Sequence, residues 1–147
     1  MAKSPNDSSV LRASMPLPAR APRKRTESTA QAEILAALNR LPGVRVARNN
    51  VGRLQDRNGT WVAYGLGVGS PDIVGIYSAG RVSGPMAVHV AAAFGVEVKS
   101  ATGRVREEQA LWHEAMRRRG LPTFLARSAD EAVRQVEVWC AEVDGAL

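Results

Sequence analysis

The feature that most constrains the fold is a long apolar run from Val88 to Ser100 that contains the charged motif Glu97-Val98-Lys99. Successive side chains of a β-strand point to opposite faces, so Glu97 and Lys99 share one face of this run and Val98 lies on the other. The face of Val98 is apolar throughout and must belong to a core. It comprises Val88, Val90, Ala92, Phe94, Val96 and Val98.

A second apolar strand is predicted just before this run. It starts at Pro71-Asp72 and continues to Tyr77. If the two strands pair antiparallel, the start of one lies beside the end of the other. Asp72 and Glu97 are then expected to meet at one edge of a sheet.

The remaining elements predict an α/β domain. Apolar residues at helical spacing run from about Thr29 until Pro42-Gly43, and Ser128 is the expected N-cap of a last helix. The expected segments are short strands at 44–48 and 61–64, a helix at 105–119 and a strand at 122–127. We summarise the order as α-β-β-β-α-β-α, a mixed β-sheet flanked by helices.

The basic charge is concentrated in an N-terminal arm. Residues 1–26 hold six basic residues and one acidic residue, so they carry five of the six net positive charges. Residues 1–28 lack aromatic anchors and sustained periodicity, and we predict a disordered arm followed by one domain at 29–147. Such an arm suits a polyanion, because binding phosphates releases counterions. The alternatives are an arm that only aids solubility and a sequence introduced by cloning.

Two further properties of the sequence bear on where the protein is found in the cell. No window approaches eighteen consecutive apolar residues, which argues against a membrane span, and the N-terminus has no apolar signal region. The single cysteine, Cys140, cannot form an internal disulfide. This fits a reducing cytoplasm, so we expect an intracellular protein of bacterial or phage type.

The residues that converge suggest a metal site. Asp72, Glu97 and the backbone carbonyl of Val98 would offer the hard oxygen ligands that Mg²⁺ or Mn²⁺ prefers. A divalent ion there could activate a water and neutralise a phosphoryl oxygen, while Lys99 stabilises the transition state. The alternative is an ordinary Glu-x-Lys ion pair on a solvated strand.

The same residues carry a resemblance to a known family. Gly69-Ser70-Pro71-Asp72, the run Phe94 to Ser100, Thr102-Gly103-Arg104 and Gln109 resemble the PD-(D/E)xK nuclease superfamily, and within it the VRR-NUC family, over roughly residues 31–142. The resemblance implies a restriction-endonuclease-like fold and Mg²⁺- or Mn²⁺-dependent DNA cleavage. Stand-alone members are linked to branched DNA such as Holliday junctions, so a homodimer is expected.

The resemblance also implies roles for single residues. Asp72 and Glu97 become metal ligands, Lys99 the catalytic lysine and Gln109 a supporting glutamine on the following helix. Glu33 on the first helix matches an acidic residue near the metal. His113 lies one turn beyond Gln109, and we interpret it as a structural or exposed histidine.

Several cations are candidates for DNA binding. Arg48 and Arg53, together with Asn49 and Asn50, are expected to line a groove near the site. Arg117-Arg118-Arg119 sits at a helix C-terminus, where the helix dipole also stabilises cations. The full set of candidate DNA-binding residues is Arg23, Lys24, Arg25, Arg48, Arg53, Arg104, Arg117 and Arg118.

Three functions from different classes stay open. The first is a metal-dependent endonuclease that acts on branched DNA, with flap or exonuclease activity as a variant of the same chemistry. The second is a non-catalytic DNA-binding module with a nuclease-like fold. The third is a small interaction domain whose basic tail binds a protein.

Overall fold

The apolar run forms β5, Val88–Val98, in the interior of a four-stranded sheet. The structure is a computed structural model that describes residues 26–82 and 88–147. The strand order is β1-β4-β5-β6, in which β4 is antiparallel to β1 and β5 while β6 is parallel to β5. The other elements are α1 (Glu27–Leu38), β1 (Val44–Arg48), β2 (Gly52–Gln55), β3 (Trp61–Tyr64), β4 (Ile73–Val82), α2 (Glu107–Arg117), β6 (Thr123–Ala126) and α3 (Ala129–Gly145).

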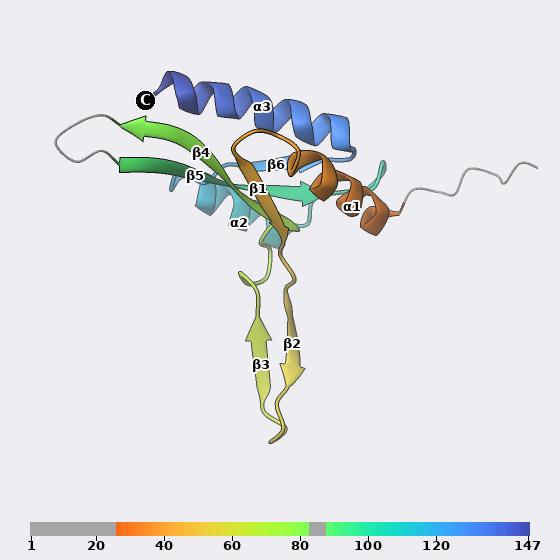
Figure 1. The fold of residues 1–147 in the computed structure, drawn as a ribbon. Coiled ribbons are helices and arrows are strands. Elements are labelled where there is room, and N and C mark those ends of the chain that lie inside the picture. Colours follow the sequence, from red (N-terminus) through yellow and green to blue (C-terminus); the bar gives the residue numbers. More distant parts are fainter. Residues whose placement is uncertain (1–25, 83–87) are drawn as a thin grey trace, which may run out of the picture.

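Helices cover both faces of this sheet (Figure 1). Helices α1 and α3 pack on each other and on one face, and α2 lies on the other. The predicted core face of β5 is confirmed at Phe94, Val96 and Val98, which are all buried beneath α1 and α3. The Phe94 ring lies 5.1 Å from that of Trp139 and 6.1 Å from that of Phe124, between centroids.

The predicted element order contained too few strands. Five strands, β1 to β5, precede α2. Four of them correspond to the predicted segments 44–48, 61–64, 71–77 and 88–100, although the summarised order gave three. The segment Gly52–Gln55 has no β-branched residue and becomes β2 because it pairs with β3 in a separate hairpin. Helix α1 begins at Glu27, two residues before its expected start, because the Thr26 hydroxyl caps it by accepting the amide of Thr29.

Some expectations fall outside the described residues. Most of the predicted arm, with its candidate DNA contacts Arg23, Lys24 and Arg25, lies in residues 1–25. Residues 83–87, between β4 and β5, also lie outside them. Among the residues that are described, no helix has the length and apolar character needed to span a membrane.

Candidate active site

The antiparallel pairing of β4 and β5 brings Asp72 to the motif Glu97-Val98-Lys99. Ile73 pairs with Val96, so the preceding residue, Asp72, stands beside Glu97. The amide of Val98 donates a 2.8 Å hydrogen bond to Oδ2 of Asp72. The antiparallel pairing predicted from the sequence is therefore confirmed, and it fixes the Asp72 carboxylate at the end of β5.

Two side chains from other elements hold the backbone at Asp72. Nε2 of Gln31, which is buried on α1, donates to the carbonyl of Asp72 at 3.2 Å. The side-chain amide of Asn49 donates to Oγ of Ser70 and to the carbonyl of Pro71, both at 2.8 Å. The backbone amide of Asn49 also donates a hydrogen bond to the carbonyl of Asp72. These bonds fix the point where β4 begins.

Glu97 is the centre of the site. Its side chain is fully buried, and its Oε1 lies 2.5 Å from Nζ of Lys99 and 2.5 Å from Nε2 of Gln109. Its other oxygen, Oε2, is buried and has no hydrogen-bond partner among the described residues. The carboxylate therefore has one oxygen held in place, while the other has no donor to balance its negative charge.

Gln109 joins helix α2 to the sheet. Its Oε1 accepts a 3.0 Å bond from the amide of Arg106 at the start of α2, while its Nε2 donates to Glu97. Gly69 brings the loop before Asp72 against the same helix. It has a φ of 86°, and a Cβ there would lie 2.4 Å from the carbonyl oxygen of Glu108, so only glycine allows this close approach.

His113 lies one turn beyond Gln109. Of the two roles considered from the sequence, a structural or an exposed histidine, the structure shows the structural one. The side chain is buried, and its Nε2 lies 3.7 Å from Oε2 of Glu97. Burial, followed by the positive charges of Arg117 and Lys99, lowers the pKa of His113. The imidazole is therefore neutral at pH 7, and its contact with Glu97 is not an ion pair.

The charges around Glu97 also favour the binding of a cation. Burial raises the pKa of Glu97 above 4.5, and the negative charge of Asp72 raises it further, whereas Lys99 and Gln109 lower it. Two carboxylates that repel each other in a buried place are costly unless a cation balances them. One nearby ammonium does not cancel the effect of burial.

The donor set fits a divalent ion. The described residues contain no group of three or more His, Cys, Asp or Glu side chains arranged around a common point. Asp72 and the unpartnered Oε2 of Glu97 nevertheless supply two anionic oxygens. Mg²⁺ usually binds through one or two carboxylates and takes its other ligands from water and substrate phosphates. The residues present match that pattern.

An acidic residue of α1 that the sequence analysis did not single out, Glu27, lies near the site. Oε1 of Glu27 lies 3.8 Å from Nζ of Lys99. Glu33 is exposed on the same helix, and its place near the metal stays a prediction from the resemblance.

A polar groove of about 420 Å³ lies beside Asp72. Arg48, Asn49 and Asn50 line it, in the place expected from the sequence, whereas Arg53 lies farther along strand β2. Its lining also includes Gln31, Val51, Tyr64, Ser70 and Asp72. The groove provides one route by which a charged ligand approaches Asp72.

The other candidate cations are exposed. Arg104 lies in the loop that follows Lys99. Arg117 and Arg118 pair with Glu114 at 2.6 and 2.9 Å, on the last turn of α2. Exposed pairs of this kind contribute little to stability, so both guanidinium groups can exchange the carboxylate for a phosphate.

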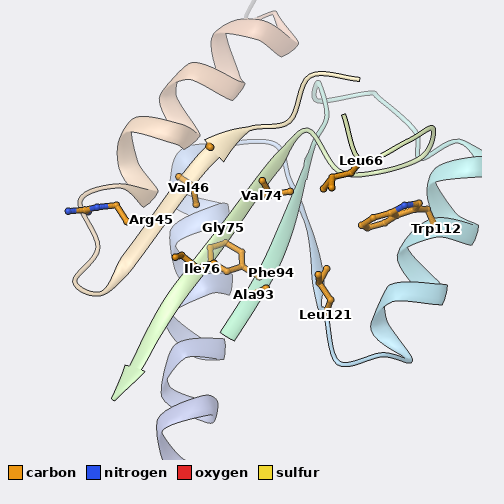
Figure 2. Close-up of a pocket in the computed structure, with 11 residues that line it drawn as sticks. Arg45, Val46, Leu66, Val74, Gly75, Ile76, Ala93, Phe94, Trp112 and Leu121 are labelled. Carbon is orange, nitrogen blue, oxygen red and sulfur yellow. The ribbon is translucent and has the colours of Figure 1, made fainter. Parts of the chain in front are cut away.

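A second groove, of about 470 Å³, lies on the same side of the sheet as α2 but has an apolar lining (Figure 2). Figure 2 shows Leu66, Trp112 and Leu121 beside strands β4 and β5, where Val74 and Ala93 form the floor. Without carboxylates, this groove cannot supply the chemistry of the Asp72–Glu97 site.

Sequence reasoning missed several supporting residues. Gln31 lies three residues before the apolar Ile34, so its place on the buried side of α1 was readable from helical spacing. Asn49 was proposed for a groove, but its role in holding the start of β4 depends on a contact with residues 70–72. The burial of His113 depends on the packing of α2 against the sheet, which no local pattern specifies.

The site predicts a specific titration of Glu97. In the metal-free chain its pKa is expected above 4.5 because of burial. Asp72→Asn should lower the pKa of Glu97 by removing a negative neighbour, and Lys99→Met should raise it by removing the ammonium. Carbon-detected NMR of the side-chain carboxyl measures both shifts. A pKa that neither substitution moves would mean that the three groups do not interact.

Comparison with known proteins agrees with this geometry. The family model of the VRR-NUC domain matches residues 25–130, which is more than half of the chain. No curated protein and no solved structure matches the chain. The VRR-NUC domain is a nuclease domain of the PD-(D/E)xK type, and the mixed sheet with flanking helices is consistent with it. The chain therefore belongs to the VRR-NUC family, a family of nuclease-like modules that process DNA.

Proposed function

We propose that this protein is a nuclease that hydrolyses phosphodiester bonds of DNA and depends on Mg²⁺ or Mn²⁺. The observation that carries the proposal is the buried Glu97 carboxylate. Lys99 and Gln109 hold one of its oxygens, and the other has no hydrogen-bond partner among the described residues. The carboxylate of Asp72 lies at the end of the same strand. Membership of the VRR-NUC family supports the same activity.

The residues have distinct roles in this reaction. Asp72, Glu97 and the carbonyl of Val98 would hold the cation. The bound ion would lower the pKa of a water and neutralise a phosphoryl oxygen. The ammonium of Lys99, fixed by Glu97, would orient the attacking water and stabilise the negative charge that grows on the phosphate. Gln109 would keep the Glu97 carboxylate in its orientation.

We further propose that the substrate is branched DNA, such as a four-way junction, and that the protein acts as a homodimer. The support is the resemblance of the chain to stand-alone VRR-NUC proteins, since symmetric cutting needs two sites on opposed strands. Arg104, Arg117, Arg118 and the basic arm are candidate contacts with the DNA backbone, and Arg48 is a candidate in the polar groove. The single cysteine is consistent with the predicted intracellular setting. The bacterial or phage origin stays a prediction.

A cleavage panel tests the proposed activity. Linear duplex, single strand, flap, splayed arm and four-way junction are each incubated with Mg²⁺, Mn²⁺ or EDTA. We expect products with either ion, none with EDTA, and the fastest cutting on a branched substrate. If the protein binds DNA in a salt-sensitive way but forms no cleavage products under any condition, the proposed nuclease activity is contradicted and the protein is a DNA-binding module. Products only from free ends would indicate an exonuclease.

Gln109→Ala is expected to slow cleavage by about 10- to 100-fold, the usual effect of losing a group that orients a metal ligand. The metal concentration for half-maximal rate should rise as well, because the Glu97 carboxylate loses a fixed orientation. Glu107→Ala, at an exposed position in the same turn of α2, is the matched control. If Gln109→Ala only lowers the melting temperature and leaves the metal requirement unchanged, its role is to cap the helix.

A further inference from the structure

Hairpin β2–β3 carries an unusual concentration of exposed apolar side chains. Among the described residues, four of the twelve exposed large hydrophobic residues lie in the hairpin and three more lie in the segments that flank it; Trp61 is 64% exposed. The hairpin projects from the domain at the end of the sheet where β1 ends and β4 begins (Figure 1). A two-stranded hairpin that extends alone into solvent is marginally stable, so its exposed surface calls for a binding role.

The strand register divides these side chains between two faces. Arg53 pairs with Ala63 and Gln55 pairs with Trp61, so all four residues share one face. Leu54, Val62 and Tyr64 share the other. Arg53 is the diagonal neighbour of Trp61 on the first face, which therefore combines a guanidinium with the largest aromatic side chain.

The charge of the hairpin is positive. From position 48 to 64 the chain contains Arg48, Arg53 and Arg57 against a single acidic residue, Asp56. The carboxylate of Asp56 is occupied within the turn, where Oδ1 accepts the amides of Asn58 at 2.8 Å and Thr60 at 2.9 Å. The guanidinium groups thus dominate the field around the hairpin.

The base of the hairpin is attached directly to the candidate active site. Oδ1 of Asn49 accepts the amide of Leu66 at 3.4 Å, so Asn49 links both ends of the hairpin to the segment that leads into Asp72. Val51 and Tyr64, at the foot of the hairpin, line the same polar groove as Asp72. A DNA strand that enters the polar groove toward Asp72 therefore passes the foot of the hairpin.

We propose that hairpin β2–β3 is a DNA-binding arm that grips the nucleic acid next to the phosphate under attack. Arg53 and Arg57 contact backbone phosphates, and the indole of Trp61 stacks on a base that is unpaired or splayed from the helix. The inference rests on the proposed action on DNA. It adds that substrates with an unstacked base near the cut are favoured, because a fully stacked duplex offers no face to Trp61.

Equilibrium binding in EDTA tests the arm without any cleavage step. Fluorescence anisotropy compares a labelled splayed-arm DNA with a linear duplex of the same length, using the full chain. Trp61→Ala should weaken binding to the splayed arm by about tenfold and binding to the duplex much less, whereas Trp61→Phe should retain most of the affinity. Arg53→Ala combined with Arg57→Ala should weaken binding to both DNAs and lower the slope of log affinity against log salt by about 2.

The opposite face of the hairpin supplies the matched control. Leu54→Ser and Val62→Ser change residues of the same strands that point away from Arg53 and Trp61. These variants should bind DNA as the unchanged chain does. The proposal is overturned if Trp61→Ala leaves both affinities unchanged, or if Leu54→Ser and Val62→Ser dissociate a dimer and abolish DNA binding, which would make the hairpin an interface between copies. Either result in EDTA is independent of whether the chain cleaves DNA.

Discussion

Replacing Glu97 by Gln is expected to reduce DNA cleavage by at least about a thousandfold, equivalent to about 4 kcal/mol of activation free energy. The substitution keeps the size of the side chain but removes the negative charge proposed to bind the cation. Asp72→Asn should have an effect of the same order, because each carboxylate supplies one anionic oxygen to the same ion. Single-turnover cleavage of a four-way junction in Mg²⁺ measures both losses.

The same experiment needs a control for folding and for charge. Glu107→Gln removes one negative charge from an exposed position on α2 and should leave the rate unchanged. Circular dichroism establishes that each variant keeps its helices. Cleavage within about tenfold of the unchanged chain in both Glu97→Gln and Asp72→Asn would contradict the assignment of the carboxylates.

Phe94→Ala should reduce the free energy of unfolding by about 3–5 kcal/mol, a large part of the 5–15 kcal/mol typical of a domain. Phe94 is 1% exposed, and its ring packs against those of Phe124 and Trp139, which also contact each other. Its loss leaves a cavity that the surrounding rings cannot fill. Urea denaturation followed by circular dichroism measures the change.

Ile76→Ala is the matched control for this loss. Ile76 is on the neighbouring strand β4 but is about half exposed, so its truncation should cost much less. A similar loss of stability in both variants would mean that the core does not lie on the side of the sheet assigned here. Substitutions on the two faces of β5 are thus expected to have different effects. Phe94→Ala should lower stability, and Glu97→Gln should abolish cleavage without unfolding the chain.

The two faces of β5 were predictable because the strand period of two is visible in the sequence. Apolar residues at 94, 96 and 98 specify the core, and Glu97 and Lys99 then fall on the other side. The contact between Asp72 and this motif could also be predicted, because antiparallel pairing of the two strands places Asp72 beside Glu97. A short-range pattern was sufficient here because strand alternation and pairing leave few other arrangements.

Other parts of the site depend on contacts that the sequence does not encode locally. The hydrogen bonds of Asn49 join segments about twenty residues apart. The contact of Glu27 with Lys99 depends on how α1 packs against the sheet, which the sequence of the helix alone does not specify. Strand β2 has weak intrinsic strand preference, and its pairing with β3 decides its conformation.

The proposal that Asp72 and Glu97 share one divalent ion is tested most directly by anomalous X-ray scattering from crystals grown with Mn²⁺. We expect a manganese peak in contact with both carboxylates, and no such peak in Glu97→Gln crystals grown in the same way. A peak that contacts neither side chain, or crystals without bound manganese at a concentration that supports cleavage, would contradict it.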